Sequence, residues 1–252
     1  MPQHPKRVQV VDFGPRLNKP NVIVGVPEAG LVGTIACSYI VEQLKLEERG
    51  YIDSDFMPPV MVVHDSGARY PMHIFGKDNL VVIISEVPLA GRLSFEVAKE
   101  VAAWAKSTKA ELVVGVTGAP SRAREEAQGD GKSTVVGVGN DETSLQALQT
   151  SGALPFQDGV MTGFYASLLK YLMKERQSGA VLLAESLGQF PDPGASVSII
   201  EALNPLLSLK VDSNALLKEA EGIRLRTREL MQQTQQAQQP AAPQNGGSSA
   251  YR

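Results

Sequence analysis

The sequence predicts an α/β protein built on a mixed β-sheet that is flanked by helices. Short β-branched runs alternate with amphipathic helices along most of the chain, which is the pattern of βαβ units and parallel strands. One pair of apolar runs, Met72–Phe75 and Leu80–Ser85, is separated only by Gly76-Lys77-Asp78-Asn79, which predicts an antiparallel hairpin. With 252 residues, 43% of them hydrophobic, the chain is long enough for one such domain with a large core.

The alternation opens with the unit Asn21–Leu44. Its first part, Val22–Val26, is a β-branched run typical of a buried strand, and its last part has apolar residues at three- and four-residue spacing, typical of a helix. Between them lies a turn that contains Gly25, Gly30 and Gly33. These glycines allow a sharp reversal and a close approach of the helix to the strand.

The remaining strands and helices are predicted from the same two patterns. We expect further strands at Arg7–Phe13, Val60–Val63, Met72–Phe75, Leu80–Ser85, Glu111–Val116, Val135–Gly139 and Ala180–Ala184, and further helices at Leu93–Ser107, Asp141–Ser151, Gly159–Lys174 and Pro193–Leu207. Asn140 or Asp141 is expected to cap the second of these helices, and Gly152 to end it. The segment Ser121–Ser133 is charged and almost free of bulky apolar groups, so it is expected to be a mobile surface loop.

The composition divides the chain into three parts. Residues 1–210 form the α/β domain, and residues 211–235 form a long C-terminal helix in which Leu216, Ile223 and Leu230 recur every seven residues. Residues 236–252 are rich in Gln, Pro, Ala, Gly and Ser, which is typical of a flexible, disordered tail.

The glycine-rich turn does not match a nucleotide-binding loop. No lysine follows Gly33, as a phosphate loop requires, and Glu28 stands where a dinucleotide fingerprint would have its first glycine. A carboxylate at this position would also oppose a pyrophosphate at the helix N-terminus. The turn is therefore interpreted as a close-packed corner, and no cofactor is assigned.

Charge and cysteine usage exclude several classes. The net charge is −3 and the basic residues are scattered, so we expect neither nucleic acid nor an anionic membrane as a partner. Cys37 is the single cysteine, which excludes an internal disulfide. The sequence has no run of about eighteen apolar residues and no leader pattern, so a cytoplasmic protein is expected.

Three carboxylates lie just past the ends of predicted strands: Glu28, Glu86 and Glu185. If those strands are parallel neighbours, the three acids would line the crevice where open α/β sheets bind ligands. This pattern supports an alternative hypothesis, an enzyme or a small-molecule binder that uses these carboxylates. The sequence shows no Ser-His-Asp set, no metal-spaced histidine pair and no Cys-His pair, so no catalytic residue and no metal ligand is assigned.

The last three residues form the other candidate site. Ala250, Tyr251 and Arg252 follow a segment without aromatic residues, since no aromatic occurs between Phe190 and Tyr251. A tyrosine on a flexible tether can fill a pocket and donate a hydrogen bond, while a chain-end carboxylate can meet a lysine. This pattern indicates a docking peptide.

Five segments give the sequence a resemblance to a known family: PEAGLVGTIA at 27–36, YIVEQL at 39–44, GYIDSDFMPPVMVVHD at 50–65, ISEVPL at 84–89 and WAKS at 104–107. Between Val22 and Leu207 the chain resembles the PAC2 family, the archaeal-type homologues of proteasome assembly chaperones. The resemblance implies a fold like that of the nucleoside-phosphorylase and peptidyl-tRNA-hydrolase group, a homo-oligomer and no catalytic activity.

The resemblance also implies a partner. Some archaeal members dock a C-terminal hydrophobic–tyrosine–any-residue motif between α subunits of the 20S proteasome, and so promote its assembly or open its gate without ATP. Carried over by position, that motif is Ala250, Tyr251 and Arg252. The expected function is a non-enzymatic proteasome-binding chaperone or activator. The alternatives are the enzyme or small-molecule binder described above and an oligomeric scaffold.

Overall fold

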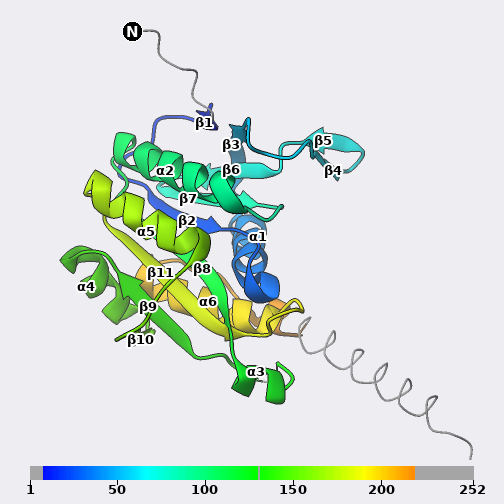
Figure 1. Cartoon of the computed structure of the whole chain (residues 1–252), viewed down its shortest axis with the longest axis vertical. Helices are drawn as coiled ribbons and strands as arrows, with labels where there is room; N and C mark the ends of the chain where they lie inside the picture. The colour runs from blue at the N-terminus through cyan, green and yellow to red at the C-terminus, as the bar shows by residue number, and fades with distance from the viewer. Residues whose placement is uncertain (1–7, 130, 219–252) are drawn as a thin grey trace, which may run out of the picture.

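The structure, a computed structural model, describes residues 8–129 and 131–218 (Figure 1). Its centre is a nine-stranded sheet in the order β1-β3-β6-β7-β2-β8-β11-β9-β10. In this order the strands are β1 (Val8–Asp12), β3 (Glu47–Ser54), β6 (Met72–Lys77), β7 (Leu80–Ser85), β2 (Asn21–Gly25), β8 (Leu112–Pro120), β11 (Gly179–Ser186), β9 (Val135–Gly139) and β10 (Leu154–Pro155). A separate two-stranded sheet pairs β4 (Val62–His64) with β5 (Gly67–Arg69).

The main sheet is mixed, which confirms the predicted fold class. Its middle, β7-β2-β8-β11, is parallel, whereas β1, β3, β6 and β7 pair antiparallel in turn. The predicted hairpin is β6–β7, and its turn residue Asp78 has a positive φ of 51°. On the other side β9 runs antiparallel to β11, and β10 adds two residues parallel to β9.

Helices cover both faces of the sheet (Figure 1). One face packs against α1 (Val32–Leu44), α4 (Glu142–Thr150) and α6 (Pro193–Leu206), and the other against α2 (Gly91–Ser107) and α5 (Gly163–Glu175). The central strand β2 serves both cores, because Ile23 faces the first and its neighbours Val22 and Val24 face the second. Successive side chains of a strand point to opposite faces, so a strand covered on both sides is apolar throughout.

The corner between β2 and α1 is as close as its glycines predict. A short 3-10 turn, η1 (Ala29–Leu31), joins the two elements, and Gly30 has a φ of 64°. A Cβ added at Gly33 would lie 2.1 Å from the carbonyl oxygen of Val116 on β8, and one at Gly25 would lie 2.5 Å from the carbonyl oxygen of Gly33. The first turn of α1 therefore lies directly on the backbones of β2 and β8.

Strand β3 was not among the predicted elements. Its sequence, EERGYIDS, contains only one aliphatic residue, Ile52, which is fully buried. The strand forms because it lies between β1 and β6, and because Gly50 allows the backbone of β1 to approach closely: a Cβ there would lie 2.1 Å from the carbonyl oxygen of Val11. Neighbouring strands override a weak local propensity in such positions.

The segment expected to be a mobile loop is instead anchored, so that prediction is wrong. It contains the short helix α3 (Arg122–Glu126), whose Arg124 side chain is only 3% exposed. Its guanidinium donates two hydrogen bonds to Asp192, from Nε at 2.9 Å and from Nη2 at 2.8 Å, and a third from Nη1 to the carbonyl oxygen of Gly131. Asp192 also caps α6 by accepting from the backbone N–H of Ala195. A buried, bidentate ion pair thus fixes this segment to the start of α6.

The described part of the C-terminal helix packs on the domain. Residues 214–218 are helical, Val211 and Leu216 are each 5% exposed, and the hydroxyl of Tyr39 on α1 donates to the carbonyl oxygen of Asp212 at 2.7 Å. The rest of the predicted helix, residues 219–235, and the tail, 236–252, lie outside the described residues. None of the helices within residues 8–129 and 131–218 combines the length and apolar composition needed to cross a membrane.

The β2–α1 corner yields a stability prediction. Gly33→Ala should lower the free energy of unfolding by about 1–3 kcal/mol, because its Cβ meets backbone that cannot rotate away. Urea denaturation measures the difference. Gly67→Ala is the matched control, since its Cβ would lie 3.3 Å from the nearest atom and on the exposed hairpin. Equal stability of Gly33→Ala and the parent chain would contradict this description of the corner.

Candidate functional site

The candidate site is the edge of the sheet at which the parallel strands β7, β2, β8 and β11 end, called here the carboxyl edge. Glu86 follows β7 directly, Glu28 follows β2 after two residues, and Glu185 is the penultimate residue of β11. These strands are parallel and lie within one continuous run of the sheet. The topology therefore brings all three carboxylates to one edge of the sheet.

Glu28 lies between β8 and the start of α5. Its carboxylate accepts a hydrogen bond from Thr117 Oγ1 at 3.1 Å and another from the backbone N–H of Phe164. The N-cap residue of α5, Thr162, makes no side-chain cap of its own, so Glu28 supplies one from a distant part of the chain. Gly163, with a φ of 78°, leaves room for it, because a Cβ there would lie 3.1 Å from Glu28 Oε1. Burial raises the pKa of Glu28 above its ordinary value of 4.5, and the two hydrogen bonds oppose that rise in part.

Tyr165, which follows Phe164 on α5, places its hydroxyl between β2 and β8. The hydroxyl donates to the carbonyl oxygen of Val116 on β8 at 2.6 Å and accepts from the backbone N–H of Val26, just past β2, at 2.9 Å. The side chain is 1% exposed, and Gly115 makes room for its ring. Burial raises the pKa of this phenol well above its ordinary range, so it stays protonated and acts as a fixed bridge. The bridge takes the place of a direct ladder bond where β2 and β8 separate.

Glu86 contacts two histidines. Its carboxylate oxygens lie 2.9 and 3.1 Å from His64 Nε2, and Oε1 lies 3.3 Å from His73 Nε2. His73 is 3% exposed and also contacts Glu48 Oε1 through Nδ1 at 2.9 Å. These residues come from β3, β4, β6 and the segment after β7, so no spacing pattern along the chain predicts the cluster.

Glu185 has a different neighbourhood. Its Oε1 accepts from Ser121 Oγ at 3.2 Å, and its backbone N–H and carbonyl oxygen bond to Thr134 and Ser133. Each of the three carboxylates is therefore satisfied by its own partners. Within the described residues, no group of three or more His, Cys, Asp or Glu side chains is arranged to hold a metal ion.

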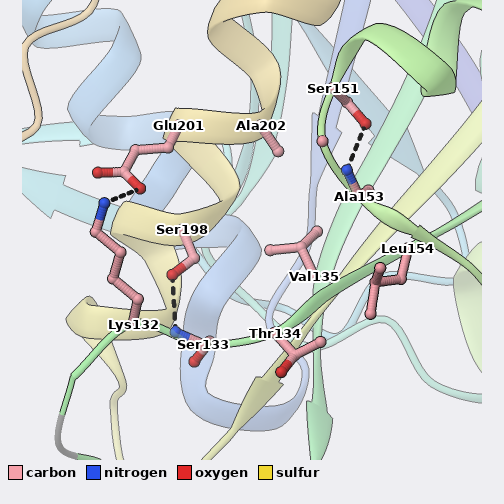
Figure 2. Close-up of a pocket in the computed structure, with 11 residues that line it drawn as sticks. Lys132, Ser133, Thr134, Val135, Ser151, Ala153, Leu154, Ser198, Glu201 and Ala202 are labelled. Carbon is pink, nitrogen blue, oxygen red and sulfur yellow. Dashed lines mark hydrogen bonds and ion pairs between the residues drawn. The ribbon is translucent and has the colours of Figure 1, made fainter.

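Two cavities of the described residues lie away from these carboxylates. One of about 290 Å³ lies beside β9, β10 and α6 (Figure 2) and is lined by Lys132–Val135, Ser151–Leu154, Ser198, Glu201 and Ala202. Its polar groups bond to one another: Lys132 Nζ lies 2.8 Å from Glu201 Oε2, and the backbone N–H of Ser133 donates to Ser198 Oγ. A second, of about 460 Å³, lies at the opposite edge of the sheet, against the turn between β6 and β7. Neither is lined by Glu28, Glu86 or Glu185.

The second candidate site, Ala250, Tyr251 and Arg252, lies outside the described residues. It stays a prediction from the sequence.

The fold and the carboxyl edge define an α/β protein with a mixed, doubly covered sheet whose edge carboxylates act as structural acceptors. The model of the PAC2 family matches residues 22–231. The chain belongs to the PAC2 family.

Solved structures and a sequence relative agree with this assignment. The chain is similar to PbaA of Pyrococcus furiosus, an archaeal homologue of a proteasome-assembly chaperone, with 31% identity, a TM-score of 0.82 and coverage of 92% of this chain and 94% of that one. It shares the fold of PbaB of the same organism, an archaeal proteasome activator, with 19% identity, a TM-score of 0.77 and coverage of 90% and 99%. An uncharacterised protein of Methanocaldococcus jannaschii is 27% identical over 214 residues, which cover 85% of this chain and 86% of the relative.

The buried position of Glu28 leads to a pH prediction. Because its pKa is higher in the folded chain than in the unfolded chain, the folded protein binds more protons just above pH 4.5, and stability falls as pH rises through the folded pKa. Glu28→Gln cannot ionise, so it should remove this part of the pH dependence. Thermal unfolding of both proteins from pH 4 to 8 tests this. Exposed Glu111→Gln is the control, and parallel curves for Glu28→Gln and the parent would contradict the prediction.

A second prediction concerns the hydroxyl bridge. Tyr165→Phe removes the partner of a buried N–H and a buried carbonyl, so the free energy of unfolding should fall by about 1–3 kcal/mol. Chemical denaturation measures the loss. Tyr171→Phe, on the same helix but partly exposed, should stay close to the parent. A loss of the same size in both variants would show that the bridge has no special role.

Proposed function

We propose that this chain is a proteasome-binding protein that promotes assembly of the 20S particle or opens its gate without ATP, and that it catalyses no reaction. The observation that carries the proposal is the likeness to PbaA, which extends over nearly the whole of both chains at 31% identity. Membership of the PAC2 family and the fold shared with PbaB support the same class of function. The carboxyl edge supports the non-catalytic part, because each of its acids has a structural partner.

Ala250, Tyr251 and Arg252 are the residues that we assign to docking on the α ring. The support is the position-by-position match to a hydrophobic–tyrosine–any-residue motif, together with the lack of aromatics in the segment before it. The tyrosine ring would fill a pocket between α subunits, and its hydroxyl would hydrogen-bond there. Alanine offers little apolar area, so a single tail would bind weakly.

Self-association would compensate for that weakness. In a homo-oligomer several tails could engage several pockets at once, which raises the effective affinity if the tethers reach. Thirty-four residues follow Lys218, the last described residue. At roughly 3.3–3.6 Å per extended residue they could span at most about 120 Å.

Deleting 250–252 tests the docking assignment. The truncated protein should no longer co-elute with 20S particles or stimulate their peptide hydrolysis, while its oligomeric state, measured by light scattering, stays the same. Deleting 246–248 is the matched control, since it shortens the tether equally and keeps the tripeptide. Tyr251→Ser should reproduce the effect of the deletion. Unchanged binding by both tail variants would defeat the docking assignment.

Two further measurements separate the alternatives. If the chain is an oligomeric scaffold, removal of 219–252 would dissociate the oligomer. The truncation begins at residue 219 because Leu216 is buried in the core and must be kept. For an enzyme or small-molecule binder, calorimetry with nucleosides, sugar phosphates and divalent metals would reveal a ligand whose binding Glu28→Gln or Glu86→Gln weakens. The raised pKa of Glu28 is the one observation that favours this alternative.

A further inference from the structure

The β4–β5 hairpin forms an arm that stands apart from the nine-stranded sheet (Figure 1). Each strand has three residues, and the turn residues Asp65 and Ser66 both have positive φ, as a two-residue hairpin turn of the primed type requires. All three residues of β5 are exposed. A two-stranded sheet of this size is marginal by itself, so its position depends on contacts with the rest of the molecule.

One such contact joins the arm to the carboxyl edge. His64, the last residue of β4, places Nε2 2.9 and 3.1 Å from the two carboxylate oxygens of Glu86. The side chains are 47% and 27% exposed, so the contact is open to solvent on the side of the arm.

The same carboxylate faces a buried imidazole on its other side. His73 Nε2 lies 3.3 Å from Glu86 Oε1 but makes no hydrogen bond, and it is buried. The other ring nitrogen, Nδ1, lies 2.9 Å from Glu48 Oε1. Glu48, His73, Glu86 and His64 thus form a chain in which carboxylates and imidazoles alternate, from β3 through β6 and the end of β7 to the arm.

This order restricts where protons can be. A neutral His73 that donates from Nδ1 to Glu48 leaves Nε2 without a proton, and this nitrogen lies 3.3 Å from an oxygen of Glu86, which is also an acceptor. Two acceptors at this distance repel each other, so the arrangement is favourable when His73 carries a second proton. Glu86 then lies between two imidazolium groups, which fixes its carboxylate in the position that His64 contacts.

We propose that Glu48, His73, Glu86 and His64 form a proton-dependent latch that holds the β4–β5 arm on the carboxyl edge. With both imidazoles protonated the arm is closed. Loss of these protons as pH rises removes the charge that orients Glu86 and weakens its contact with His64, so the arm opens. Imidazole is the side chain that most commonly changes charge near neutral pH, so the latch is tested across that range.

Other titratable and charged groups lie near the latch: Tyr51 on β3 is opposite His73, and its ring stacks on that of Tyr70. Asp65 follows His64 in the turn, and Arg69 lies on β5, opposite Val62. Arg49, next to Glu48, is held by Asp12 at 3.0 Å, and Arg92, at the start of α2, lies over the ring of Phe56. Among the residues that the structure describes, the carboxylates in contact with the two imidazoles are Glu48 and Glu86.

Amide hydrogen exchange of the arm tests the latch. Protection factors for residues 62–69, corrected for the intrinsic effect of pH, should fall roughly two- to fivefold between pH 5.5 and 8, as expected for one partly exposed ion pair. His64→Gln is exposed and should fold normally, with low protection that does not change with pH. Glu111→Gln, at the opposite edge of the sheet, should behave like the parent.

Nitrogen-15 spectra of the His73 ring provide a second, independent measurement. Both ring nitrogens should be protonated at pH 5.5, and one should lose its proton by pH 8. A ring that keeps one charge state over this range overturns the proposal. So does protection of the arm that is constant with pH, or that is unaffected by His64→Gln. Proteasome binding does not enter either measurement, so the proposal stands or falls apart from the proposed function.

Discussion

The close contact of α1 with the ends of β2 and β8 determines most of what surrounds it. Gly25 and Gly33 let the helix lie directly on strand backbone, and that approach fixes the path of the chain through η1. On the opposite face Tyr165 reaches the same place and joins the two strands where they separate. Glu28 lies between them and caps α5. One corner therefore connects both cores and the carboxyl edge, and the Glu28 carboxylate of its glycine-rich turn bonds to the protein's own groups.

Much of this architecture follows from local signals. The β2–α1 unit, the β6–β7 hairpin and the helix that begins after Asp141 were all predictable, because each combines an apolar period with a specific turn or cap residue. Asp141 forms a capping box with Ser144, and Gly152 follows that helix with a φ of 73°. Where the local sequence signal and the tertiary packing favour the same element, the sequence alone predicts that element.

The elements that could not be predicted depend on distant partners. Strand β3 has few apolar residues and exists because two strands pair with it. The segment around Arg124 has the composition of a loop, yet one arginine reaches Asp192, 68 residues further along the chain. The candidate site likewise has one part that the sequence predicts and one part that it does not. Topology alone placed Glu28, Glu86 and Glu185 at one edge, but their partners Thr117, Ser121, His64 and His73 come from separate segments. Long-range partners leave no periodic trace in a sequence.

The two edge strands of the main sheet, β10 and β1, differ in how readily a strand of another molecule could pair with them. At one end β10 has only two residues and finishes with Pro155, which has no N–H to offer, so an incoming strand would find almost no template there. At the other end the last strand in the sheet order is β1, which has five residues. Strand pairing between molecules is thus disfavoured at β10 by its length and its proline, whereas β1 has no such feature among its five residues.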